Sequence, residues 1–281
     1  MNRLRVKHVA GFSYASSVNA SYNEARMLPQ DCAGQVVLSS RLAIEPEAQQ
    51  YFYTDGWGTK VSSFEVLCPH DRLTLEAVSL VEVDRAPAQP ARLDWAQLAR
   101  LGAATTKLVE QSRQTARTAP PAEVSELAAA AAARHPWPHE AALAICGAIR
   151  DRVEYVQGVT TVEATAADAW AHGRGVCQDM AHIALGALRA CGVPARYVSG
   201  YMHPEASPDV GVPAVGESHA WVEWFCGEWI GFDPTNGVEV ANRHVLVGRG
   251  RDYDDVAPIR GVYAGSGTSA IFVEVEITRE S

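Results

Sequence analysis

The sequence predicts an α+β protein in which a small β-sandwich-like domain, residues 1–90, precedes a larger domain of helices and strands, residues 91–281. Three observations support this prediction. Strand-like runs fill the first 83 residues, helix-like stretches follow them, and a further helix is succeeded by three more strand-like runs. The chain has 281 residues, which is enough for one large domain or two ordinary ones.

The N-terminal domain is expected to consist of short strands joined by turns. Runs typical of strands occupy residues 36–44, 51–53 and 61–66, and Asp55-Gly56-Trp57-Gly58 is typical of a hairpin turn. Residues 73–83 have the alternating period of a half-buried strand, which places on one face Leu73, Leu75, Ala77, Val81 and Val83. These patterns predict a sheet with one face against a core.

Helices are expected after a joint of prolines and alanines at residues 86–90. Residues 93–115 and 122–134 are typical of two helices, the second preceded by Pro120-Pro121, and residues 139–153 of a third. This stretch predicts a helical connection between the two domains.

The rest of the chain is expected to combine one central helix with strands. The helix begins at about Cys177 and ends near Cys191, because Gly192 and Pro194 cannot continue it. Strand-like runs then occupy residues 195–202, 218–225, 228–232 and, last, 270–278.

The charge balance argues against one class of partner. Lys and Arg total 24 and Asp and Glu total 33, so the formal net charge is −9. A protein that binds nucleic acid needs a clustered basic face, and the sequence shows no such cluster. We therefore expect no nucleic-acid partner.

The apolar segments and the cysteines indicate the compartment. The first 17 residues lack the continuous apolar region of a signal peptide. The longest low-polarity run, residues 127–133, is far shorter than the roughly 20 residues that span a bilayer. We therefore expect a cytoplasmic protein without a membrane anchor. Its six scattered cysteines are expected to be free thiols.

One of these cysteines stands where catalysis by a thiol would need it. Cys177 follows a glycine-containing turn and begins a predicted helix, whose N-terminal amides and dipole favour a thiolate. Apolar residues follow it at helical spacing, namely Met180, Ala181, Ala184, Leu188 and Cys191. The thiol is therefore expected at the end of the buried stripe of its helix.

The strands that follow contain a histidine and an aspartate that a hairpin would bring together. A three-residue loop at Cys226-Gly227-Glu228 pairs residues whose numbers add up to 454, which places Asp233 opposite Trp221 and diagonal to His219. A loop of even length would separate the two side chains onto opposite faces. With the three-residue loop, a carboxylate can hold an imidazole that activates a thiol.

Each of these residues also has a purely structural interpretation. A cysteine at a helix end is usually a small buried apolar residue, and a histidine in a strand is often partly buried without any chemical role. An aspartate before proline often forms a turn. Because three chemically matched residues converge under one packing assumption, the combination keeps the catalytic interpretation open beside the structural ones.

Several motifs resemble those of a known family. They are Gly173-Arg174-Gly175-Val176-Cys177-Gln178-Asp179, Ala195-Arg196-Tyr197-Val198-Ser199-Gly200-Tyr201, Ser218-His219-Ala220-Trp221-Val222-Glu223 and Gly231-Phe232-Asp233-Pro234-Thr235-Asn236. In this order they resemble the bacterial transglutaminase-like superfamily, which contains cysteine-peptidase-like proteins with a Cys-His-Asp triad. The N-terminal half resembles the β domain that precedes the catalytic core in these proteins, through Arg26-Met27-Leu28-Pro29, Asp55-Gly56-Trp57-Gly58 and Pro69-His70-Asp71-Arg72-Leu73.

The resemblance implies a papain/transglutaminase-like α+β core in which Cys177 is the nucleophile, His219 the base and Asp233 the orienting carboxylate. Papain-like proteases carry an oxyanion-hole glutamine six residues before the cysteine, where this chain has Ala171. The backbone N–H of Cys177 is therefore expected as one oxyanion donor, and a side chain of Tyr155-Val156-Gln157 or Trp170 as the second. Asn236 is a weaker rival of Asp233, because asparagine also fills the third position in papain-like enzymes.

Other signals near the cysteine are not interpreted as a metal or nucleotide site. His172, Asp179 and His182 are close in sequence to Cys177, but their spacing is not that of metal-ligand motifs, so no metal and no cofactor are expected. The aspartates at 252, 254 and 255 lack the remaining ligands of a calcium loop. Trp221 shares the strand face of His219 and is the tryptophan most suited to contact a substrate.

The expected function is a thiol-dependent hydrolase that acts on amide or peptide bonds through a thioester acyl-enzyme. The expected partner is a peptide or protein amide substrate. Two alternatives remain at this stage. The acyl group can pass to an amine instead of water, as in a cross-linking transglutaminase, or the chain can be a non-catalytic binding module whose β domain is the recognition surface.

Overall fold

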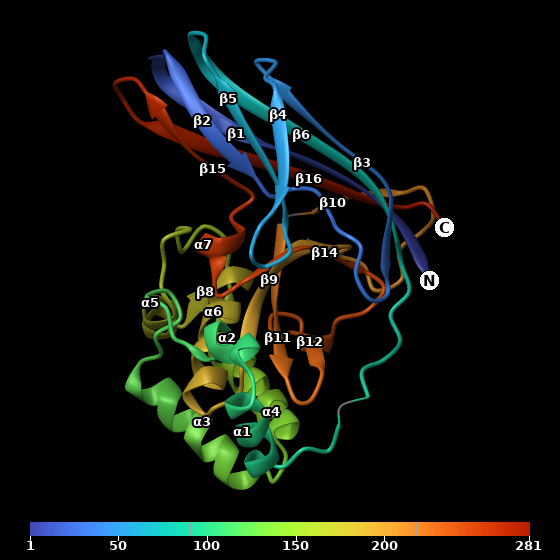
Figure 1. Ribbon diagram of the computed structural model, residues 1–281, viewed down its shortest axis with the longest axis vertical. Helices are drawn as coiled ribbons and strands as arrows, with labels where there is room; N and C mark the ends of the chain where they lie inside the picture. Colours follow the sequence, from blue (N-terminus) through green and yellow to red (C-terminus); the bar gives the residue numbers. More distant parts are fainter. Residues whose placement is uncertain (90, 217) are drawn as a thin grey trace.

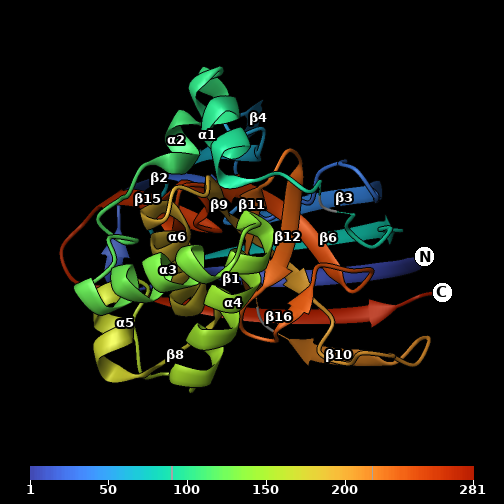
Figure 2. The ribbon, with the colours of Figure 1, turned by 90° about the horizontal axis from the view of Figure 1, so that it is seen from below.

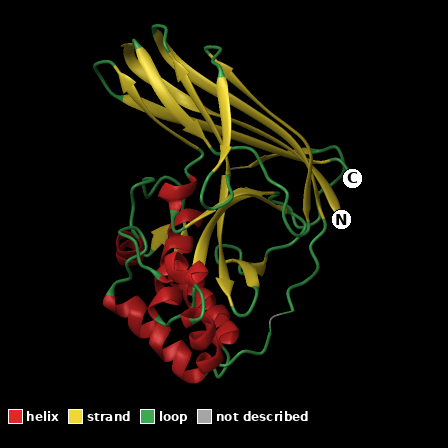
Figure 3. Ribbon diagram, viewed as in Figure 1, coloured by secondary structure: helices red, strands yellow, loops and turns green. Residues whose placement is uncertain are grey.

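The computed structural model describes residues 1–89, 91–216 and 218–281. It consists of two packed β-sheets at one end and a cluster of helices with a third sheet at the other (Figures 1 and 3). We call the first part the β module and the second part the helix–sheet core.

The β module is made of a five-stranded sheet in the order β10-β16-β1-β6-β3 and a four-stranded sheet in the order β15-β2-β5-β4. Its strands are β1 (Asn2–Val18), β2 (Ala20–Ala25), β3 (Gln35–Glu45), β4 (Gln50–Thr54), β5 (Lys60–Val66), β6 (His70–Val83), β10 (Pro213–Gly216), β15 (Ile259–Ala264) and β16 (Ser269–Arg279). The predicted alternation along β6 is confirmed, because all five residues assigned to one face are buried. The predicted turn joins β4 to β5, where Gly58 has a φ of 82°.

The helix–sheet core has a five-stranded sheet in the order β13-β12-β11-β9-β14 and a short parallel pair, β7 with β8. Its helical elements are α1 (Trp95–Ala103), η1 (Thr106–Leu108), α2 (Val109–Ser112), α3 (Ala122–Arg134), α4 (Pro138–Arg152), α5 (Ala166–His172), α6 (Cys177–Ala190) and α7 (Tyr253–Val256). Its strands are β7 (Glu154–Tyr155), β8 (Arg174–Gly175), β9 (Ala195–Met202), β11 (Ser218–Phe225), β12 (Trp229–Asp233), β13 (Val238–Glu239) and β14 (His244–Gly250).

The strand pairing crosses the domain boundary that was predicted at residue 90. The expectation assigned all of residues 91–281 to the second domain, but β10, β15 and β16 pair with strands of the first. β16 runs antiparallel to β1 from Leu4↔Arg279 to Tyr14↔Ser269, and Figure 2 shows the two side by side. The apolar alternation at residues 270–278 predicts a strand but not its partner, because pairing joins segments that are distant in sequence.

The helix expected over residues 93–115 is also different, because it is broken into α1, η1 and α2. α1 ends at Ala103, and the side chain of Thr105 then accepts a hydrogen bond from the backbone N–H of Lys107 at 3.1 Å and caps η1. A threonine that bonds to nearby backbone competes with helix continuation, which accounts for the break.

A shared apolar layer joins the β module to the core. Residues of β1, β6 and β16 pack on β9 and β14 in a cluster that includes Val6, Val81, Ile277, Tyr201 and Val245. The five-stranded sheet of the β module therefore lies directly over the core sheet, close to the strands that carry the predicted site (Figure 1).

Candidate active site

Cys177 begins α6, which is the central helix of the core. Every residue from Cys177 to Arg189 is buried, because α6 contacts α3, α4 and α5 as well as β9 and β11. The sequence predicted one buried stripe, whereas the helix is enclosed on all sides. Cys177 is 8% exposed and lines a cavity.

The turn before Cys177 is held by a glycine and a carboxylate. Asp179 accepts through Oδ2 the backbone N–H of Val176 at 2.8 Å and the hydroxyl of Thr160 at 2.6 Å. A Cβ at Gly175 would lie 2.7 Å from the Asp179 side chain, so only glycine fits there. Burial raises the pKa of Asp179 above its ordinary value, against the effect of these two hydrogen bonds. The start of α6 is thereby fixed relative to the loop at residue 160.

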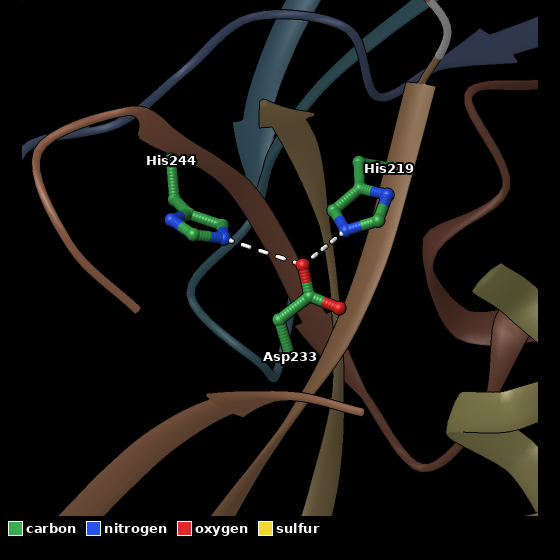
Figure 4. A group of neighbouring side chains, drawn as sticks. All are labelled: His219, Asp233 and His244. Atoms are coloured by element: carbon green, nitrogen blue, oxygen red, sulfur yellow. Dashed lines mark hydrogen bonds and ion pairs between the residues drawn. The ribbon is translucent and has the colours of Figure 1, made fainter. Parts of the chain in front are cut away.

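His219 and Asp233 are brought together by the predicted hairpin. β11 and β12 pair from Val222↔Phe232 to Phe225↔Trp229, so the numbers add up to 454 as the three-residue loop requires. The backbone N–H of Cys226 donates to the carbonyl of Glu228 at 3.0 Å and closes the turn. The ring nitrogen Nε2 of His219 lies 2.7 Å from Oδ2 of Asp233 (Figure 4). The predicted register is confirmed.

Asp233 is fully buried and accepts hydrogen bonds on both carboxylate oxygens. The backbone N–H groups of Thr235 and Asn236 donate to Oδ1, at 3.0 and 3.1 Å. The side-chain amide of Asn236 donates to Oδ2 at 2.7 Å. Asn236 therefore orients the carboxylate, and Asp233 is the residue that contacts His219.

A second imidazole, that of His244, also faces this carboxylate, although no sequence motif indicates it. It begins β14, and its Nε2 lies 3.5 Å from Oδ2 of Asp233, opposite His219 (Figure 4). Burial lowers the pKa of His244, although the bond to Asp233 acts in the other direction, so the ring is neutral near pH 7. The run His-Val-Leu-Val-Gly could have been recognised as a strand, but no local pattern indicates its proximity to Asp233.

The electrostatics couple His219 to both of its neighbours. Burial alone would lower the pKa of His219, but hydrogen bonds to Asp233 and to Cys177 outweigh it and raise the pKa to about 10. Burial alone would raise the pKa of Asp233, but the bonds from His219 and His244 hold it well below its usual range. Since Nε2 faces Asp233, the other ring nitrogen, Nδ1, is the one available to the thiol.

Three side chains here present possible metal-ligand atoms within 4.8 Å of one another: His219, Asp233 and His244. The hydrogen bonds do not fit a metal ion. The backbone N–H of Ala241 donates to Nδ1 of His244 at 3.2 Å, so the proton of the neutral ring is on Nε2, the atom that would have to bind the ion. Asn236 also directs an N–H at the same carboxylate oxygen. The group is arranged around an anion, the Asp233 carboxylate.

A cavity of about 1060 Å³ lies in front of Cys177 and His219. Its wall on the core side includes Tyr155 and Gln157, and its other wall comes from β1, β10 and β16 of the β module. Gln157 follows β7, which pairs with the strand just before Cys177, and the N–H of Val156 donates to the carbonyl of Gly175 at 2.9 Å. This pairing keeps the segment of the predicted second oxyanion donor beside the thiol.

Neither Trp170 nor Trp221 is among the residues that line the cavity. The indole N–H of Trp170 donates to Glu123 at 2.7 Å, so this donor is already engaged. Trp221 is fully buried and packs against His219 and His244, with ring centroids 6.2 and 5.4 Å apart. It supports the two imidazoles from within the core.

The other candidates are also engaged in structural contacts. His182 is buried, accepts the backbone N–H of Tyr253 at 3.2 Å, and has its pKa lowered by burial to about 3. His172 is exposed on α5, where it contacts the carbonyl of Asp168. Asp254 and Asp255 form ion pairs with Arg117 and Arg251.

Comparison with known proteins agrees with the expected family. Residues 125–234 match the family model "Transglutaminase-like superfamily", and residues 4–82 match "Bacterial transglutaminase-like N-terminal region". An uncharacterized protein of Mycobacterium leprae is 40% identical over 279 residues, which cover 99% of each chain. An uncharacterized protein of Mycobacterium tuberculosis is 33% identical and covers 98% of this chain and 92% of its own.

One solved structure has the same fold over the whole chain. It is described as "a Putative Cysteine Protease from Cytophaga hutchinsonii", and it superposes with a TM-score of 0.78 at 22% identity, covering 100% of this chain and 91% of that one. Within the described residues, no helix is both long and apolar enough to cross a membrane. Together with its relatives, these matches show that the chain belongs to the transglutaminase-like superfamily, a family of papain-like thiol enzymes, and carries the bacterial N-terminal region of that family.

Proposed function

We propose that the protein is a thiol-dependent hydrolase of amide or peptide bonds, with Cys177 as nucleophile, His219 as acid and base, and Asp233 as the orienting carboxylate. The observation that carries the proposal is the position of one imidazole, which bonds a buried carboxylate through Nε2 and interacts with a cavity-lining thiol. This is the arrangement that nucleophilic catalysis by cysteine requires.

The reaction follows from the protonation states. The raised pKa of His219 favours an imidazolium beside a thiolate, so the sulfur can attack an amide carbonyl carbon in the cavity. The imidazolium then gives its proton to the departing amine, which leaves a thioester on Cys177. Water attacks the thioester while His219 takes a proton from it. The C–S bond then breaks, which releases the carboxylic acid and restores the thiolate.

The carbonyl oxygen becomes negatively charged during both attacks and needs hydrogen-bond donors. Cys177 is the first residue of its helix, so its backbone N–H is among those without an intrahelical partner. Gln157 lines the same cavity and carries an amide donor, and this position favours it over Trp170 as the second donor. Transfer of the acyl group to an amine requires only that an amine replaces the water.

The test is the alkylation rate of each cysteine by iodoacetamide between pH 4 and 9, read by peptide mass spectrometry. Cys68 is exposed and serves as the matched thiol. We expect Cys177 to react at pH 5 despite its burial, when Cys68 does not, and His219→Ala to remove this difference. Cys177→Ala should then abolish hydrolysis of amide substrates. If Cys177 and Cys68 respond to pH in the same way, the thiolate–imidazolium pair does not exist and a binding module is the better explanation.

A further inference from the structure

The wall of the cavity that belongs to the β module contains a strand edge that pairs with β10 over only part of its length. β10 pairs with β16 from Pro213↔Thr278 to Gly216↔Val275. The chain then leaves this sheet, and by Ser218 it pairs with Tyr201 of β9. Within the described residues, no strand pairs with this side of β16 from Ser269 to Glu274.

The hydrogen bonds at the two ends of β16 show which backbone groups point to that edge. The N–H of Ala15 donates to Thr268 at 3.0 Å, and the N–H of Glu280 donates to Arg3 at 2.7 Å, so even-numbered residues of β16 bond to β1. The register between these ends has no shift. Odd-numbered residues therefore point to the opposite edge, as Arg279 does when it accepts the N–H of Gly211 at 2.7 Å.

Val273 lies both on this edge and in the wall of the cavity. Its N–H and C=O point to the edge by the parity above, and its side chain is 47% exposed. Val273 and Glu274 line the cavity together with Cys177 and His219. An unpaired strand edge accepts an extended chain as an additional strand, because main-chain groups supply the affinity.

We propose that an unfolded polypeptide segment binds as an extended strand on the β16 edge at Val273, continuing the line of β10, and thereby delivers its amide bond to Cys177. The inference rests on the proposed function and specifies its substrate class, an unfolded chain in preference to a folded surface or a small amide. Apolar side chains near the edge, from Met202 and Pro204, give a surface for side chains of the bound segment.

The test measures binding without chemistry, in the Cys177→Ala protein. The probe is fluorescein-labelled α-lactalbumin that has been reduced and carboxymethylated, so that it is unfolded, and its disulfide-intact folded form is the comparison. Val273→Pro removes one outward N–H while leaving the bonds to β1, and proline is tolerated at strand edges. We expect it to raise the dissociation constant for the unfolded probe about tenfold.

Ser40→Pro is the matched control, on the opposite edge of the same sheet. The carbonyl of Leu42 accepts a side-chain hydrogen bond from Gln50 at 3.0 Å, so Leu42 and, two residues away, Ser40 point outward. Val273→Ala keeps the N–H and must weaken binding less than Val273→Pro does. If Val273→Pro binds the unfolded probe as well as Ser40→Pro does, or if the probe does not bind at all, the proposal is wrong.

A second measurement needs no change at residue 273. Hydrogen exchange of residues 269–275 in the Cys177→Ala protein should slow when the unfolded probe saturates it, and unchanged exchange would overturn the proposal. The two proposals fail separately. If hydrolysis is insensitive to Val273→Pro, binding at the β16 edge is wrong and the proposed hydrolase function stands. If binding depends on Val273 but no hydrolysis occurs, the hydrolase function is wrong and binding at the edge stands.

Discussion

The two walls of the cavity differ in how their side chains are held. On the core side, Cys177 and His219 belong to a helix and a strand buried within the core, and Asp233 behind them is completely enclosed. On the side of the β module, Val215 and Val273 lie on strands that are half open to solvent, with exposed fractions of 89% and 47%. Under the proposed function, the enclosed wall would carry the chemistry and the open wall would carry recognition, since precise geometry requires neighbours that cannot move.

The sharpest test of the rigid wall is Asp233→Asn. The amide keeps the shape but not the charge, so we expect kcat/KM to fall on the order of 10²–10⁴-fold. Because Asp233 helps to raise the pKa of His219, its loss should move the high-pH limb of the kcat/KM profile to lower pH. Asp255→Asn, which alters a carboxylate paired with Arg251 away from the cavity, is the control. A profile that does not move would mean that Asp233 only supports the fold.

His244→Phe is expected to reduce activity less than Asp233→Asn does, and to move the high-pH limb in the opposite direction. The substitution keeps an aromatic ring against Trp221 and removes the N–H that faces Asp233. Asp233 then becomes more basic and the pKa of His219 rises, so the high-pH limb should move upward while kcat falls about tenfold.

The pH profile separates this role of His244 from a merely structural one. His139→Phe is the control, because His139 bonds to Trp224 and is not a partner of Asp233. A downward shift of the limb in His244→Phe would contradict the proposed role and point to loosened packing.

The smallest effect is expected on stability, from a histidine where the β module contacts the helix–sheet core. His8 is 1% exposed there, its Nδ1 contacts the hydroxyl of Tyr201 at 2.8 Å, and burial lowers its pKa to about 4. A folded-state pKa below the ordinary value of 6.5 means that the unfolded chain binds more protons, so stability falls as the pH drops below about 6.5.

For His8 alone, the free energy of unfolding should decrease by about 1 kcal/mol from pH 7.5 to pH 5.5. His8→Gln should remove this part of the slope and leave the part due to His182. Denaturant unfolding of both proteins at the two pH values is the measurement. If the free energy of unfolding depends on pH equally in the two proteins, His8 is accessible to water in solution.

Local patterns predicted what depends on neighbours in sequence. The loop Cys226-Gly227-Glu228 determined the register that joins His219 to Asp233, and the glycine turn before Cys177 indicated the helix start. The sequence could not indicate that β16 joins β1, or that His244 lies behind Asp233, because both depend on how distant segments pack. The wall of the β module was missed for the same reason.

The place of β16 between β1 and β10 has a consequence for synthesis. During translation β6 can cover one side of β1 early, but the other side of β1 has no partner until β16, the last strand described, leaves the ribosome. An uncovered strand edge is a template for association with other chains. Residues of the same late strand line the cavity, so the nascent chain cannot complete the cavity wall before β16 has been made.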